Sequence, residues 1–219
     1  MKTRVTLLLA LVVLMASCKQ KVKTGQDVIH LMKEKFNNTY IENFTFSQHL
    51  IAYDNDTIKK EEIWHEAYSF LGSLIVKVGS LESDSGYIFH QDTLRIISKN
   101  KVAVKMEHVN ELTVLGFDIY PDPIEKTVKR LTKQGFDLTK VIETKLRGRD
   151  VYCVGALSED EQANKFYIDK ENLYFVKCVK IRKHGISEVE CTDFKEIENQ
   201  PVATKLTFYR NGKVNMTED

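Results

Sequence analysis

Residues 166–178 read FYIDKENLYFVKC, two runs of aromatic and β-branched residues on either side of a short polar segment. Aromatic and β-branched side chains favour strands, whereas Asp169 and its charged neighbours suit a turn. Strands joined by so short a connection pair antiparallel, because parallel pairing needs a long crossover. This stretch therefore predicts an antiparallel hairpin.

The same pattern extends in both directions along the chain. Segments such as FTFSQHLIAY (44–53), SLIVKVG (73–79) and KVAVKM (101–106) are short, and turn signals such as DND and RNGK separate them. About ten or eleven such segments occur, and consecutive strands usually lie side by side. The sequence predicts an α+β, mostly β fold with one large antiparallel sheet, and a sheet of this size must curl.

Two segments have the spacing of helices instead. The first follows Thr24 and Asp27, which are placed as a capping box, and its apolar residues recur at helical spacing until about Asn37. The second is DPIEKTVKRLTKQG (122–135), in which Asp122 suits the N-cap, proline the first helical position and glycine the end. We expect both helices to cover one face of the sheet.

The N-terminus has the layout of a lipoprotein signal peptide. The apolar run 5–15 has 11 residues, about half of the ~20 that a membrane-spanning helix needs, and it follows two basic residues. Two small residues stand directly before Cys18, which resembles the bacterial lipobox, where the cysteine receives acyl chains and becomes the new N-terminus. We predict a signal peptide at 1–17, a lipidated tether at 18–26 and a single domain at 27–219.

Composition limits the classes of function. Removal of residues 1–17 takes away two of the 32 basic side chains, and the remaining 30 nearly balance 31 acidic ones. Such a balance gives no attraction to nucleic acid. The six histidines are scattered, and the sequence has no H-E-x-x-H, C-x-x-C, G-x-S-x-G, P-loop or Rossmann pattern. We therefore expect no enzymatic activity, no metal site and no cofactor.

Several segments together resemble one known family. These are IWHEAYSF (63–70), LGFDIY (115–120), GRDVYCVGA (148–156), FYIDKENLYFVKC and ATKLTFYRNGK (203–213), in this order. The order and spacing resemble the outer-membrane lipoprotein-sorting proteins, relatives of the LolA carrier and the LolB receptor, over roughly 27–212. The resemblance implies an incomplete β-barrel whose apolar concave side is lidded by helices and holds acyl chains. The cysteine at position 18 makes this chain similar to the anchored receptor rather than to the soluble carrier.

The alternation of side chains along each strand indicates which residues would line such a cavity. Side chains two residues apart share one face of a strand, so the apolar residues of each strand fall into groups. The candidates are Trp64, Tyr68, Phe70, Leu74, Val76, Val78, Phe89, Phe166, Ile168 and Phe175. The alternative for each is a filled core, since aromatic residues mostly serve packing.

Two functions remain open at this point. The first is a lipid-anchored protein, facing the periplasm from a membrane that we expect to be the outer one, which binds acyl chains or the lipid moiety of a lipoprotein. The second is an anchored interaction module with a filled core, which binds a protein partner at its rim or edge. We expect a monomer in both cases.

The remaining cysteines suggest one pairing. If His184 and Gly185 form a two-residue hairpin loop, Cys178 faces Cys191 on the neighbouring strand. Because an exported chain meets an oxidising compartment, the pair is a candidate disulfide. The alternative is two reduced cysteines. Cys153 is then left free.

Overall fold

The computed structural model describes residues 21–36, 39–70, 72–198 and 200–219. The predicted signal peptide and Cys18 lie outside these residues. None of the helices in the described ranges has the length and apolar character needed to cross a membrane.

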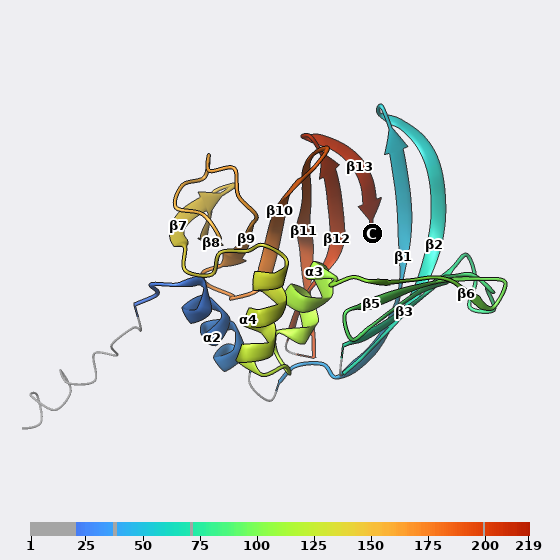
Figure 1. The fold of residues 1–219 in the computed structure, drawn as a ribbon, viewed down its shortest axis with the longest axis horizontal. Helices are drawn as coiled ribbons and strands as arrows, with labels where there is room; N and C mark the ends of the chain where they lie inside the picture. The colour runs from blue at the N-terminus through green and yellow to red at the C-terminus, as the bar shows by residue number, and fades with distance from the viewer. Residues whose placement is uncertain (1–20, 37–38, 71, 199) are drawn as a thin grey trace, which may run out of the picture.

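One curled antiparallel sheet of thirteen strands dominates the fold, in the order β6-β5-β4-β3-β2-β1-β13-β12-β11-β10-β9-β8-β7. It is not closed, so β6 and β7 are its two edges (Figure 1). The strands are β1 Asn43–Asp54, β2 Thr57–Ser69, β3 Ser73–Val78, β4 Gly86–His90, β5 Thr93–Ser98, β6 Lys101–Glu107, β7 Val141–Leu146, β8 Arg149–Val154, β9 Lys165–Asp169, β10 Phe175–Arg182, β11 Gly185–Ile197, β12 Gln200–Arg210 and β13 Lys213–Glu218. The curled sheet is confirmed, but the expected number of strands was too low. The two unexpected strands, β7 and β13, carry no aromatic residues.

The helices are α2 Gly25–Lys35, α3 Glu111–Thr113, the π-helical turn η1 Val114–Asp118 and α4 Ile124–Lys133. Helix α2 begins as predicted, with the reciprocal Thr24 and Asp27 capping box. The N-cap of α4 is Pro123 rather than Asp122. The Asp122 carboxylate instead accepts hydrogen bonds from Lys126 and Arg130, and this removes it from the cap.

The main core lies between these helices and one face of β8–β12. Helix residues Met32, Leu115 and Leu131 are fully buried against Phe166 and Ile168 of β9. Figure 1 shows α2, α4 and α3 grouped at this part of the sheet, while β3–β6 extend away from them. The helices therefore cover only part of the concave face.

Few cross-strand residue pairs join the helix-covered part of the sheet to strands β1–β6. Between β1 and β13 the register runs only from Leu50 opposite Glu218 to Ala52 opposite Met216. His49 and Asp219 extend it by exchanging two backbone hydrogen bonds. This short junction brings the first and last strands of the chain together.

The β10–β11 hairpin differs from the predicted register. Arg182 is opposite Gly185, so Lys183 and His184 form the loop and Cys178 faces Val189 rather than Cys191. The physical reason is a close approach by the neighbouring β12–β13 turn. A Cβ atom on Gly185 would lie 2.0 Å from the Asn211 side chain, which accepts a hydrogen bond from the Ile186 amide. The glycine is needed at the start of β11, and Cys153, Cys178 and Cys191 are all buried free thiols.

Candidate functional site

Cross-strand register gathers apolar side chains of β2, β3 and β4 on one face. Trp64 is opposite Val78, and Tyr68 is opposite Leu74. On the next pair, Leu74 is opposite Phe89. Directly opposed residues share a face of the sheet, so these side chains form one continuous surface on the concave side.

We call the aromatic part of this surface the aromatic strip; it consists of Phe44, Phe46, Trp64, Tyr68, Tyr87, Phe89 and, from η1, Phe117. Its rings contact one another in two groups, one around Phe44 and one formed by Trp64 and Tyr87. Phe44 lies 5.2 Å from Tyr68 and 5.0 Å from Phe117 between ring centroids, and Trp64 lies 5.4 Å from Tyr87. Apart from Tyr68, which is buried, these side chains are half-buried. The strip thus exposes ring surface beyond the helices.

The predicted cavity residues divide between two environments. Six of them lie on the concave face of β2–β4, on or beside the aromatic strip: Trp64, Tyr68, Leu74, Val76, Val78 and Phe89. Phe70 lies beyond the end of β2 and stacks on Tyr40, with 6.3 Å between the ring centroids. Phe166, Ile168 and Phe175 are buried in the helix-covered core. The structure therefore does not bring all ten together.

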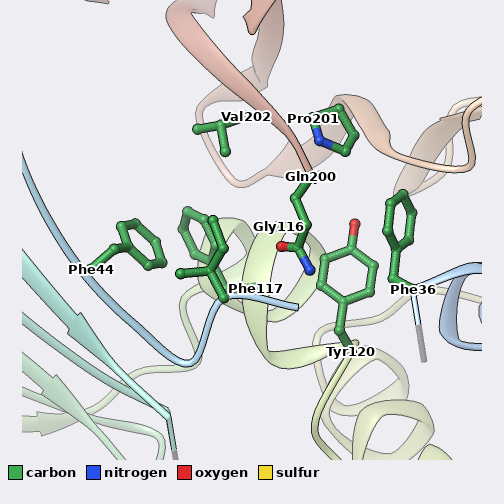
Figure 2. A pocket seen from close by; sticks show the side chains of 9 residues that line it. Phe36, Phe44, Gly116, Phe117, Tyr120, Gln200, Pro201 and Val202 are labelled. Carbon is green, nitrogen blue, oxygen red and sulfur yellow. The ribbon is translucent and has the colours of Figure 1, made fainter. Parts of the chain in front are cut away.

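Little empty space remains next to the helices. A pocket between η1, β1 and β12 encloses about 20 Å³, with Phe44, Phe117 and Val202 among its lining residues (Figure 2). One water molecule needs roughly 10–15 Å³ by this measure, so an acyl chain does not fit here without rearrangement.

Two buried carboxyl groups lie on this face, Glu66 of β2 opposite Phe46 and Glu218 of β13 opposite Leu50. Glu66 and Glu218 are each 7% exposed, and the Gln48 side chain donates a hydrogen bond to Glu66. Burial, followed by the nearby charge of Glu218, raises the pKa of Glu66 to about 8. Burial also raises the pKa of Glu218 to about 7. Both groups therefore retain protons close to neutral pH.

A buried ionic cluster attaches α4 to the rest of the molecule. The Arg130 guanidinium donates to Asp118 of η1 at 2.6 Å and to Asp92 of the β4–β5 turn at 2.8 Å. The Tyr68 hydroxyl donates to the other oxygen of Asp118 at 2.7 Å. These bonds satisfy the Asp118 carboxylate, which is only 2% exposed. They also hold Phe117, the preceding residue, against Tyr68 of the aromatic strip.

Sequence reasoning missed part of this site. Phe44 and Phe46 alternate within FTF, so strand periodicity was a sufficient signal for them. Phe117 gave no such signal, because a short π-helical turn brings it to the sheet. Within the described ranges, no group of three or more His, Cys, Asp or Glu side chains is arranged to hold a metal ion.

Comparison with protein families and with curated proteins finds no match to this sequence. Solved structures do match. A DUF1329 family protein from Desulfovibrio piger has 10% identity and a TM-score of 0.56, and the match covers 89% of each chain. A LolA superfamily protein from Nitrosomonas europaea has 11% identity and a TM-score of 0.55 over 90% of each chain.

A third similar structure is an outer membrane lipoprotein-sorting protein domain from Vibrio parahaemolyticus. It has 11% identity and a TM-score of 0.57, and the match covers 89% of this chain and 88% of that one. Identities this low establish a shared fold without establishing shared ligands. The chain has a LolA-like fold.

Proposed function

We propose that this protein binds acyl chains, or the lipid moiety of a lipoprotein, on the open concave face of β1–β5. The aromatic strip carries the proposal, because all of its rings except that of Tyr68 are only half-buried on the concave face. Contiguous exposed apolar surface commonly marks a binding site. The names of two structural neighbours, a LolA superfamily protein and a lipoprotein-sorting domain, support the same class of ligand.

Apolar burial would supply the binding energy. Each Å² of apolar surface removed from water contributes about 25 cal/mol, before the cost of ordering the ligand. The buried Glu66 lies within the strip, between Trp64 and Tyr68 on β2, where a ligand's polar group could donate a hydrogen bond to it. No step of this function requires covalent chemistry.

We further propose that the protein acts while anchored through acylated Cys18, at the outer membrane and facing the periplasm. The lipobox-like sequence supports the anchor. Several acyl chains on one cysteine hold a protein stably on a bilayer, whereas one chain binds only marginally. A tethered protein cannot shuttle between membranes, so it would accept or deliver lipid at one of them.

The single tryptophan offers a direct test, because Trp64 lies within the aromatic strip. Titration with palmitate brominated along its chain should quench Trp64 fluorescence in a saturable manner. Phe46→Glu places a charge on the strip and should abolish quenching. Ile75→Glu is the matched control on the opposite face of the sheet, where Ile75 is 42% exposed, and should quench like the wild type.

The filled core beneath the helices favours the second function, an anchored module that binds a protein through its rim or an edge. Organic extraction of the purified protein followed by mass spectrometry separates the two functions. Absence of non-covalently bound acyl lipid, together with no quenching by brominated palmitate, would exclude the lipid-binding proposal and leave the interaction module.

A further inference from the structure

One carboxyl group stands among the rings of the aromatic strip. Trp64 and Tyr68 precede and follow Glu66 on the same face of β2, and Phe46 is opposite it on β1. Across β3, Tyr87 of β4 lies at the same level as Glu66. Aromatic side chains from three strands are therefore the neighbours of this carboxyl group.

The Glu66 carboxyl has one oxygen without a donor. Its side chain is more than nine-tenths buried, and among the described residues only the Gln48 amide donates to it, at one of the two oxygens. The fully buried side-chain atoms without a partner in the described part of the chain belong to Thr127 and Gln134. The second Glu66 oxygen is therefore not fully buried, and it remains open to a donor from outside.

A second buried carboxyl lies near the first, and the described residues bring no cation to either. After burial itself, the charge of Glu218 is the largest cause of the raised pKa of Glu66. Lys60, a cation on the same face of β2, is bonded to Glu62 at 2.8 Å. Two carboxyl groups thus lie on this face without the positive charge that their ionised forms would attract.

The rings of the strip are also available to a cation. In the described part of the chain, the contacts between a basic side chain and an aromatic ring use the rings of Phe36, Phe136, Tyr152, Tyr174 and Phe194. None of these rings belongs to the strip. A cation within about 6 Å of a Trp, Tyr or Phe ring face is attracted to it, most strongly to Trp.

We propose that the aromatic strip binds an amino lipid at Glu66, with an apolar chain, an ammonium head group and no phosphate. This inference rests on the proposed function, in which the strip holds the chain, and adds the head group. The ammonium donates a hydrogen bond to the open Glu66 oxygen and lies against the ring of Trp64 or Tyr87. A phosphate would bring a second negative charge toward Glu66 and Glu218, and the strip has no cation to bind it.

Binding of the ammonium requires Glu66 to lose its proton. Burial raises the pKa of Glu66 to about 8, so most of the free protein holds this carboxyl neutral at pH 7. When the ammonium arrives, the carboxyl proton passes to solvent, and the carboxylate that remains accepts a charge-assisted hydrogen bond. The neutral form of the free protein avoids the cost of a buried charge without a partner.

Equilibrium dialysis at pH 7 tests the head group with ligands of equal chain length: decylamine, decanol, decanoate and decanoyl lysophosphatidylethanolamine. Decylamine should bind at least about tenfold more tightly than each of the others, as expected for a hydrogen bond to a charged group. Equal affinities for decylamine and decanol overturn this inference but leave chain binding intact. Failure of every ligand to bind refutes the proposed function itself. Binding of the lysophospholipid as tightly as decylamine overturns the exclusion of phosphate.

Two variants locate the head group. Glu66→Gln keeps the size of the side chain and an acceptor for the Gln48 amide, so it should fold, but it has no carboxylate. Its affinity for decylamine should fall close to its affinity for decanol. Glu61→Gln, the matched control, changes an exposed glutamate on the opposite face of β2 and should keep the wild-type preference. A preference for decylamine that survives Glu66→Gln, or that is lost equally in Glu61→Gln, overturns the proposal.

Discussion

At the scale of single residues, Glu66 and Glu218 are the most unusual groups of the site. Both are buried on the concave face, and none of the ion pairs in the described part of the chain involves them. Burial raises the pKa of Glu66 to about 8 from the ordinary 4.5. Between about pH 4.5 and 8, the Glu66 carboxyl of the folded protein therefore keeps a proton that the same group has released in the unfolded chain.

This difference makes stability depend on pH. Between about pH 4.5 and 8 the folded state binds more protons than the unfolded state, so the free energy of unfolding falls as the pH rises and levels off above pH 8. Glu66→Gln keeps an acceptor for the Gln48 amide but carries no charge. It should raise the free energy of unfolding at pH 8 by about 1–3 kcal/mol and change it little at pH 5.

Urea unfolding at the two pH values measures this effect. Glu82→Gln, a change at an exposed glutamate, should leave the free energy of unfolding unchanged at both. Equal effects of Glu66→Gln at pH 5 and pH 8 would show that the Glu66 carboxyl is not held neutral by its burial.

At the scale of elements, Arg130 connects α4 to η1 and to the β4–β5 turn. Arg130→Met leaves Asp118 buried without its cation, and such a loss costs about 3–5 kcal/mol. We expect the free energy of unfolding, measured with urea, to fall by that amount. Lys133→Met on the same helix removes only an exposed ion pair with Glu107 and should change the free energy of unfolding little. Similar losses for both variants would contradict the role of Arg130.

The register of the β10–β11 hairpin gives a second prediction at this scale. Cys178 and Cys191 are not opposed, and both thiols are buried with pKa values raised by that burial, to about 12 for Cys191. Burial and a high thiol pKa suppress oxidation. Alkylation in denaturant without reductant should therefore label Cys153, Cys178 and Cys191 completely. A linked Cys178–Cys191 peptide in the mass spectrum would disprove the observed register.

At the scale of the whole molecule, the proposed anchor would determine at which membrane the concave face acts. Cys18→Ala removes the thiol that would carry the acyl chains, so the protein should leave the membrane fraction or retain its signal peptide. Membrane fractionation with mass measurement of the N-terminus tests this. As a control, Cys153→Ala should leave both membrane association and processing unchanged. Normal processing and membrane association of Cys18→Ala would contradict the proposed anchor.

Local patterns were sufficient for much of this fold. Thr24 with Asp27 located the start of α2, and the alternation around residues 166–178 located β9 and β10. Strands such as β7, Val141–Leu146, were missed because they carry no aromatic residue. The hairpin loop at Lys183 and His184 was missed because the constraint on Gly185 comes from Asn211, a residue on a different hairpin.

The sequence by itself determined the strands, the caps and the antiparallel order of neighbouring hairpins, because these depend on side chains close together in the chain. Only the tertiary structure decided that β1 meets β13, and that Phe166 fills a core while Trp64 lines an open strip. Both phenylalanine and tryptophan favour strands equally well. Whether such a side chain is covered depends on where distant helices pack, which alternation along one strand does not encode.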